Sequence, residues 1–454
     1  MAIKSGRVGV ATDQVDAYGR VVASDFLVDQ LKEVLPQTEL VPLSVNVNGV
    51  YSPDEGKGFG TVTVNVPTAY PSVTAKDINF YDYDGTCLYS YTKTEWANVT
   101  ELPSNPSHDG LIAQGWNYTK SDIDSYVTTM IVPLDVGQSY KTVSGATEVD
   151  IELFDPFLSP QIRIAPNGTS VIDWGDGHTD TVVGTNSTTS SGIKTTSHTY
   201  SSAGKYTIKI SISSGKLSLF GYSTSNSQFL MGSGGSSYSN MDKTYQSTVK
   251  HIRLGDGDLT VYGPIFACMS SLETITIPKS ETLAFSGGYN FVYCVSLKAI
   301  VVPKGITLSG NQEAGTCSSL RVISGEYTAW DNQFANCFAL KYIRFEKTRE
   351  IIYSGVCSGC WSLQKVVIPS AVTSVKSNTF NNCRSLREVH ILAGYIDENQ
   401  QVVIPTLENT NAFASNQSSR KFYVPRSENQ VILNAYKNAS NWSSFASVIE
   451  EEPA

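Results

Sequence analysis

Four residues in the middle of the chain combine carboxylates with an imidazole, a set that could bind a metal ion or transfer protons. They are Asp173, Asp176, Asp180 and His198. Calcium needs six or more oxygen ligands, and this segment offers few. Aspartates in short glycine-rich loops usually cap turns instead. We therefore expect a structural role for these residues and no metal site.

A second candidate is the pair Cys357 and Cys360, which has the spacing of a zinc or redox pair. No second pair accompanies it, and no histidine lies nearby in sequence. Cys360 also belongs to a repeating row of cysteines described below. A disulfide framework remains an alternative because the eight cysteines form an even count. The favoured interpretation is buried, reduced thiols with no metal and no cofactor.

The third candidate is Asp82-Tyr83-Asp84-Gly85-Thr86, which follows an apolar segment. It resembles the D-x-D-G-T motif of haloacid-dehalogenase phosphatases. The resemblance implies that Asp82 would attack phosphorus and that Asp84 would act as acid and base. However, the surroundings are short strands with Gly and Pro turns, without the βαβ alternation that such a fold requires. Asp-Gly between tyrosine-rich strands predicts a hairpin, so we expect no catalytic residues and a protein that is not an enzyme.

A repeat dominates the C-terminal half of the chain. The recurring pattern is a cysteine and two further residues before Leu-x-x-Ile-x-Ile, often followed by Pro. The six leucines are Leu272, Leu297, Leu320, Leu340, Leu363 and Leu386, which gives steps of 25, 23, 20, 23 and 23 residues. The cysteines of the pattern are Cys268, Cys294, Cys317, Cys337, Cys360 and Cys383. Periods of about 20–29 residues are typical of leucine-rich repeats.

The spacing of the leucines and cysteines has a physical explanation. Leu and the two apolar residues after it place side chains on one face of a short strand, and stacked copies share one continuous core. Cysteine suits the inner corner because it is small and readily buried. Residues 379–386 (TFNNCRSL) closely resemble the BspA-like (Treponema-type) signature, although the first copy has one inserted residue. The resemblance implies a solenoid over residues 223–420, closed by a cap over 421–454.

A separate module precedes the repeats. Residues 171–177 read VIDWGDG, and HTYSSAGKYTIKISI begins at His198. The first segment predicts a strand that ends in a tight turn, and residues 206–210 alternate like a half-buried strand. Both segments resemble the PKD-type immunoglobulin-like domain. The resemblance implies a β-sandwich over residues 147–222, and the fold class is therefore mainly β and multi-domain.

The N-terminal third has a different character. Residues 24–35 predict a short amphipathic helix with Ser24 as N-cap, which must pack on something to be stable. We expect an anchor or oligomerisation segment over 1–45, in a homo-oligomer with a trimer favoured, and small β spacer modules over 46–146. The net charge of −9 without a Lys or Arg run argues against nucleic acid. No signal-peptide-like segment and no apolar stretch of membrane-spanning length is visible.

Residues 46–130 resemble segments of virion proteins from phages of Gram-positive gut bacteria. The motifs are NGVYSPDEGKGF with VTVNV, and the block that begins INFYDYDGTCLYSYT. The resemblance implies a virion protein, a tail or head fibre or appendage, assembled in the host cytoplasm and exposed on the particle. Its N-terminus would bind other virion proteins.

The function that we expect is attachment of the solenoid to a host-surface glycan or protein. Charged residues make up only 17% of the chain, which favours a neutral polyhydroxyl partner. Aromatic side chains near the repeats are either stacking platforms for sugars or core filling. They are Trp330, Phe338, Tyr342, Tyr353 and Trp361. The alternatives are a decoration protein that binds no receptor, a secreted bacterial adhesin, and a glycan-cleaving spike, for which no paired carboxylates stand out.

Overall fold

The computed structural model describes residues 73–220, 245–306, 308, 314–325, 331–345 and 347–453, and the backbone of three short strands outside these ranges. The chain divides into two compact units, Met1–Ser72 and Val73–Ala454. In the first unit, β1 (Ser44–Asn48) and β2 (Thr61–Asn65) form an antiparallel pair. The helix predicted at residues 24–35 lies outside the described residues, as does most of the predicted anchor.

The second unit begins with a four-stranded sheet in the order β4-β3-β6-β5. Its elements are β3 (Ile78–Tyr81), β4 (Cys87–Tyr91), α2 (Lys93–Trp96), β5 (Leu111–Trp116), α3 (Lys120–Val127) and β6 (Leu134–Thr142). Capping boxes start both helices, from Thr92 to Glu95 and from Thr119 to Asp122. Phe80 and Trp96 stack in the core of this module, with ring centroids 5.8 Å apart. We call residues 73–146 the leading module.

The next segment consists of long antiparallel strands. They are β7 (Thr147–Leu153), β8 (Gln161–Asp173), β9 (Thr179–Thr185), β10 (Lys194–Ser197) and β11 (Gly204–Phe220), with a 3-10 turn at Ser190–Gly192. β8 and β9 form a hairpin around the predicted turn, with Asp173 opposite Thr179. Gly175 and Gly177 occupy left-handed conformations in that turn. The hairpin and the half-buried strand at 206–210 are confirmed.

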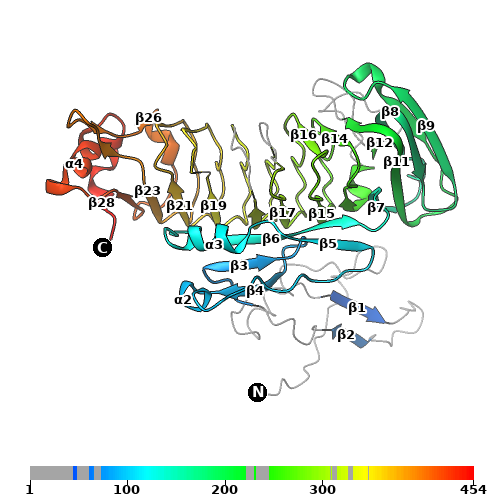
Figure 1. Cartoon of the computed structure of the whole chain (residues 1–454), viewed down its shortest axis with the longest axis horizontal. Helices are drawn as coiled ribbons and strands as arrows, with labels where there is room; N and C mark the ends of the chain where they lie inside the picture. Colours follow the sequence, from blue (N-terminus) through cyan, green and yellow to red (C-terminus); the bar gives the residue numbers. More distant parts are fainter. Residues whose placement is uncertain are drawn as a thin grey trace, which may run out of the picture. The chain divides into compact units, whose positions relative to one another are not determined.

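The repeats follow directly from these strands. β7 pairs with β11 on one side and with β13 (Val249–Arg253) on the other, and β11 pairs with β14 (Leu259–Tyr262). β13 then pairs in parallel with β15 (Thr274–Thr276), and β14 with β16 (Ala284–Ser286). Both rows of repeat strands therefore start on strands of the preceding segment (Figure 1). β12 (Leu230–Met231) pairs with β8, and a 3-10 turn spans Gln246–Thr248.

The later repeats continue as parallel ladders. One row contains β17 (Ala299–Val301), β18 (Val322–Ser324), β19 (Tyr342–Arg344), β21 (Lys365–Ile368), β23 (Glu388–Ile391), β27 (Lys421–Val424) and β28 (Ile449–Glu451). The other contains β20 (Ile351–Ile352), β22 (Ser374–Val375) and β26 (Thr406–Leu407). All six repeat leucines are buried, with exposed fractions of 1% or less. The sequence prediction of a shared leucine core is confirmed.

The C-terminal segment adds irregular and helical elements. They are β24 (Tyr395–Ile396), β25 (Val402–Val403), the 3-10 turns Thr410–Phe413 and Glu428–Gln430, α4 (Val431–Asn438) and the 3-10 helix Trp442–Val448. Trp442 is buried against Tyr436 and Phe413. This packing covers the apolar interior at the last repeat. None of the described helices is both long enough and apolar enough to cross a membrane.

The cysteines form a row in which each thiol contacts the preceding repeat. The Sγ atoms of Cys294, Cys317, Cys337, Cys360 and Cys383 each donate to a backbone carbonyl 23 or more residues earlier, at 2.9–3.1 Å. Burial raises the pKa of Cys337 well above its usual value. These thiols are therefore internal packing groups with weak hydrogen bonds.

The sequence prediction that Cys268 belongs to the row of cysteines is wrong, because Met269 occupies that position in the first copy. The amide of Leu272 donates to the carbonyl of Met269, as the amide of Leu297 does to Cys294. Cys268 has φ of 64°, the left-handed conformation of the residue that precedes each later row cysteine. The inserted residue of the first copy thus shifts its cysteine by one position.

We expect all the cysteines to be free thiols, because no pair is bonded in the structure. Alkylation of the denatured protein without reductant, followed by mass spectrometry, should modify Cys294, Cys317, Cys337, Cys360 and Cys383, and also Cys268. Native disulfides that link these positions would contradict the packed-thiol row.

Candidate binding surface

The Asp82–Thr86 segment forms the turn between β3 and β4, so the predicted hairpin is confirmed. Asp82 has an exposed fraction of 4%. Its Oδ1 accepts a hydrogen bond from the Tyr140 hydroxyl at 2.8 Å, and its Oδ2 lies 2.7 Å from Nε2 of His108. Asp84 accepts from the Thr86 amide. Both oxygens of Asp82 are thus held by neighbours, which suits a structural carboxylate.

The aspartates of the WGDG turn also have structural partners. Asp173 accepts from the Gly175 amide at 2.9 Å, and Asp176 accepts from the His178 amide at 3.1 Å. His198 lies 2.7 Å from Asp176, and Asp180 accepts from the indole of Trp174 at 2.8 Å. Turn capping is confirmed for Asp173 and Asp176. In the part of the chain that the structure describes, no group of three or more acidic, histidine or cysteine side chains is placed to hold a metal ion.

The five aromatic residues predicted to form a surface do not lie together. Tyr342 lies on β19 and lines a small pocket with Asp135 and Arg344. Tyr353 is half-buried and packs against the repeat core. Trp330 lies outside the described residues. Only Phe338 and Trp361 are brought side by side.

Phe338, Trp361 and Arg384 form a stack that we call the aromatic row. The Phe338 and Trp361 rings are stacked, with centroids 4.2 Å apart and planes at 22°. The Arg384 guanidinium lies 4.6 Å from the centre of the Trp361 ring, a cation–π distance. Trp361 is 39% exposed. The row therefore presents ring and guanidinium edges to solvent.

The repeat register positions the row. Each member directly follows a row cysteine: Cys337, Cys360 or Cys383. The Ser362 amide donates to the Phe338 carbonyl at 3.1 Å, and the Ser385 amide to the Trp361 carbonyl at 3.0 Å. Arg384 was missed from the sequence because only aromatic residues were considered. Its position after the cysteine was the signal that could have found it.

The strand-bearing side of the early repeats is occupied by the leading module. The Asn117 side chain donates to the Val302 carbonyl at 3.0 Å and to the Ser324 hydroxyl at 2.9 Å. Lys141 pairs with Asp256 at 3.0 Å. A Cβ on Gly137 would meet Val301 at 2.4 Å, so the backbone of β6 packs directly on β17. Figure 1 shows β6 and α3 along the side that carries β15, β17 and β19.

The later part of that side carries compensated charges. Lys365 pairs with Glu388 at 2.6 Å, and Lys421 pairs with Glu450. The imidazole of His390 lies 2.8 Å from Glu452 and 3.2 Å from Glu388. These ion pairs satisfy one another across β21, β23, β27 and β28. Lys365 and Lys421 on this surface are therefore already paired with carboxylates.

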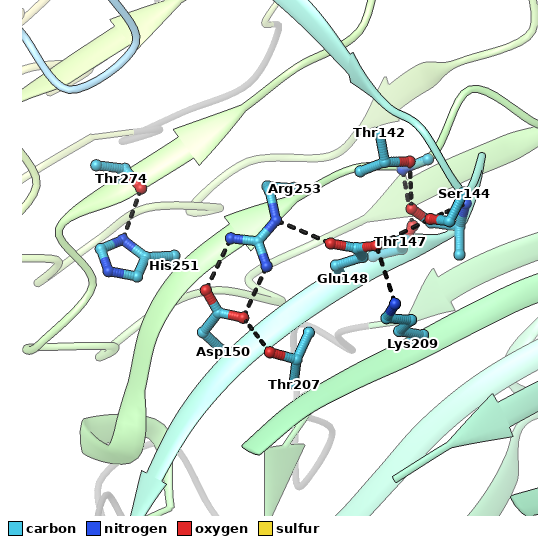
Figure 2. Close-up of polar contacts among 12 residues, drawn as sticks. Thr142, Ser144, Thr147, Glu148, Asp150, Thr207, Lys209, His251, Arg253 and Thr274 are labelled. Carbon is cyan, nitrogen blue, oxygen red and sulfur yellow. Dashed lines mark hydrogen bonds and ion pairs between the residues drawn. The ribbon is translucent and has the colours of Figure 1, made fainter. Parts of the chain in front are cut away.

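A charged cluster fixes the junction between β7, β11 and β13 (Figure 2). Arg253 of β13 donates to both oxygens of Asp150 at 2.7 Å and to Glu148 at 3.0 Å. Asp150 also accepts from the Thr207 hydroxyl at 2.8 Å, and Lys209 lies 3.7 Å from Glu148. Fork geometry makes arginine–carboxylate pairs directional as well as strong. The cluster therefore joins the repeats rigidly to the preceding strands.

Asp135 of β6 should give the protein a measurable pH dependence. Burial raises its pKa to about 6, although Asn79 donates to it at 3.2 Å. An acid whose folded pKa is raised makes the native state lose stability as pH increases from about 4 to 6, and the loss persists at higher pH. Asp135→Asn keeps the acceptor for Asn79. We expect the variant to be more stable than wild type by about 1–2 kcal/mol at pH 7 and near parity at pH 4.

Denaturant titrations of both proteins between pH 4 and pH 8 measure this difference. A constant difference at every pH would contradict the assigned role of Asp135.

Comparison with known protein families identifies the repeats. The family model described as "BspA type Leucine rich repeat region (6 copies)" matches residues 242–329 and 327–443. The chain therefore carries BspA-type leucine-rich repeats in a mainly β fold. Such repeats generally belong to binding proteins, and the match indicates no catalytic family. No curated protein matches the chain.

Three solved structures are similar to parts of the chain. A leucine-rich cell surface protein from Faecalibacterium prausnitzii A2-165 is 18% identical with a TM-score of 0.27, covering 38% of this chain and 60% of that protein. A leucine-rich repeat protein of T. pallidum is 16% identical with a TM-score of 0.22, covering 45% and 92%. One from Bacteroides ovatus ATCC 8483 is 16% identical with a TM-score of 0.24, covering 47% and 76%.

Proposed function

We propose that this chain attaches to a cell surface through the turns that directly follow the row cysteines, a surface that we call the turn side, and that the aromatic row on it contacts a surface saccharide. The observation that carries the proposal is the exposed stack of Phe338, Trp361 and Arg384. Stacked aromatic rings offer apolar faces and edges to sugar rings, while a guanidinium donates to hydroxyl oxygens. The match to BspA-type repeats supports a binding role.

The strand-bearing side of the repeats offers less free surface for a ligand. The strand side of the early repeats is filled by the leading module, and the later strands carry paired charges. The turn side is thus more available than this strand-bearing side. A solenoid would place this face of successive copies in register. Residues on it could then be substituted during evolution without disturbing the shared core.

We further propose that the chain is a phage virion protein, displayed outward from a fibre or appendage. Support comes from the resemblance of residues 46–130 to phage virion segments and from the predicted anchor at residues 1–45. A PKD-like sandwich at 147–222 would then act as a rigid spacer beneath a solenoid at 223–420. A bacterial surface adhesin is the second candidate, because BspA-type repeats suit that role equally well.

The test is sedimentation of the full chain with protein-free cell walls of candidate Gram-positive hosts. Single contacts should be weak, so the chain is presented both as free protein and at many copies on a bead. We expect bead binding that periodate oxidation of wall carbohydrate removes. No binding in either form, while particles still adsorb, would contradict the proposal. Immunolabelling of particles and of bacterial surfaces then separates the virion protein from the adhesin.

A further inference from the structure

The turn at residues 289–293, in the second repeat copy, holds two tyrosines in a backbone conformation that tyrosine rarely adopts. Tyr289 has φ of 69° and Tyr293 has φ of 63°. Both side chains are exposed, at 37% and 46%. Left-handed φ values are uncommon for bulky residues because Cβ crowds the backbone.

The fourth, fifth and sixth copies fill the same two positions with residues that tolerate this conformation. Counting five and one residues before each row cysteine, they are Asn332 and Asn336, Gly355 and Gly359, and Asn378 and Asn382. Asparagine and glycine are the residues that reach the left-handed region most readily. The second copy therefore keeps two tyrosines against the local backbone preference.

In the third copy, Thr316 occupies the position directly before the row cysteine Cys317, and its φ is 63°. The Tyr293 amide donates to the Gly315 carbonyl at 3.0 Å. The turn that contains Thr316 therefore lies beside the turn that contains Tyr293. A β-branched residue is still less suited to positive φ than tyrosine. Three neighbouring positions thus carry hydroxyl-bearing side chains in unfavourable conformations.

We propose that Tyr289, Tyr293 and Thr316 form a saccharide-binding site separate from the aromatic row. Backbone strain is retained at ligand sites, where the side chain offers something that a relaxed residue lacks. Here two phenol rings supply stacking faces, and three hydroxyls can donate to and accept from a neutral polyhydroxyl ligand. The site rests on the proposed function, and its three side chains are the surface residues that would recognise carbohydrate.

The strain makes an unusual prediction, since one double variant should be more stable than wild type and should bind more weakly. In the full chain, Tyr289→Asn with Tyr293→Asn should raise Tm by roughly 2–4 °C because asparagine relieves the backbone cost. The affinity for protein-free Gram-positive cell walls, measured by sedimentation, should fall about tenfold, the effect of losing an aromatic contact of ordinary strength. Tyr293→Phe keeps the strain and should leave Tm unchanged while weakening binding. Tyr395→Asn, at an exposed tyrosine outside this turn, should change neither quantity.

The outcomes separate this site from the broader function. If the asparagine variant binds as wild type does, while Trp361→Ala loses binding, the tyrosine site is wrong and the proposed function stands. Weaker binding by the asparagine variant alone, with Trp361→Ala unaffected, supports the tyrosine site. An unchanged or lower Tm would overturn the strain argument. A wild-type chain that binds no walls would overturn both proposals.

Discussion

Phe380→Ala is expected to destabilise the repeats by about 3–5 kcal/mol, the usual effect of truncating a fully buried phenylalanine. Phe380 has an exposed fraction of 0%. Its ring stacks on Phe413, with centroids 5.5 Å apart, and meets the edge of Phe345 at 6.2 Å. The substitution leaves a cavity between two copies, and stacked repeats transmit such a loss to their neighbours.

Urea denaturation followed by circular dichroism measures this loss. Tyr395→Ala is the matched control, because Tyr395 is 56% exposed and surface substitutions usually change stability by less than about 0.5 kcal/mol. A loss below about 1 kcal/mol for Phe380→Ala would show that the copies do not share one packed core.

Arg253→Met is expected to destabilise the junction of β7, β11 and β13 by about 2–3 kcal/mol. The side chains of Glu148 and Asp150 are only 12% and 26% exposed, and removal of the guanidinium takes away the cation that both carboxylates share, with Lys209 left at 3.7 Å from Glu148. Breaking a buried ion pair from one side costs about 3–5 kcal/mol, and partial exposure reduces that figure. Lys209→Met should cost less than about 1 kcal/mol, because Lys209 is 43% exposed and 3.7 Å from Glu148.

The Arg253 effect should also depend on pH. Burial raises the pKa of Asp150, but hydrogen bonds from Arg253 lower it overall. A lowered carboxyl pKa contributes stability above its ordinary value near 4, and this contribution is lost as pH falls through the folded pKa. The difference between wild type and Arg253→Met should therefore be largest near neutral pH and shrink below about pH 4. A difference that grows on acidification would contradict this assignment.

Local patterns predicted local structure well. The leucine spacing predicted the buried rows, and WGDG and DYDG predicted hairpins, because neighbouring residues set turn geometry and strand alternation. The insertion in the first copy was visible, and Met269 lies three residues before Leu272, the spacing that every later row cysteine has from its leucine. The prediction followed the residue type and not this spacing, and therefore placed Cys268 in the row.

Long-range packing was beyond the sequence patterns. Residues 46–146 were predicted to be spacer modules, yet Asn117 bonds to Ser324, 207 residues away. Of the aromatic candidates, Phe338 and Trp361 share a repeat position and therefore stack. Tyr342 lies instead on a strand that faces the leading module, and Tyr353 lies after β20. Equal spacing from the cysteine, rather than aromatic character, distinguishes the residues that meet.

The most direct test of the central claim compares wild type with Phe338→Ala/Trp361→Ala in bead sedimentation with protein-free Gram-positive cell walls. Both residues are at most half-buried, so the fold should persist, with circular dichroism and Tm as checks. Attachment through the aromatic row predicts that bead binding falls at least about tenfold, while Tyr395→Ala beads bind normally. Equal binding by wild type and the double variant would contradict the account.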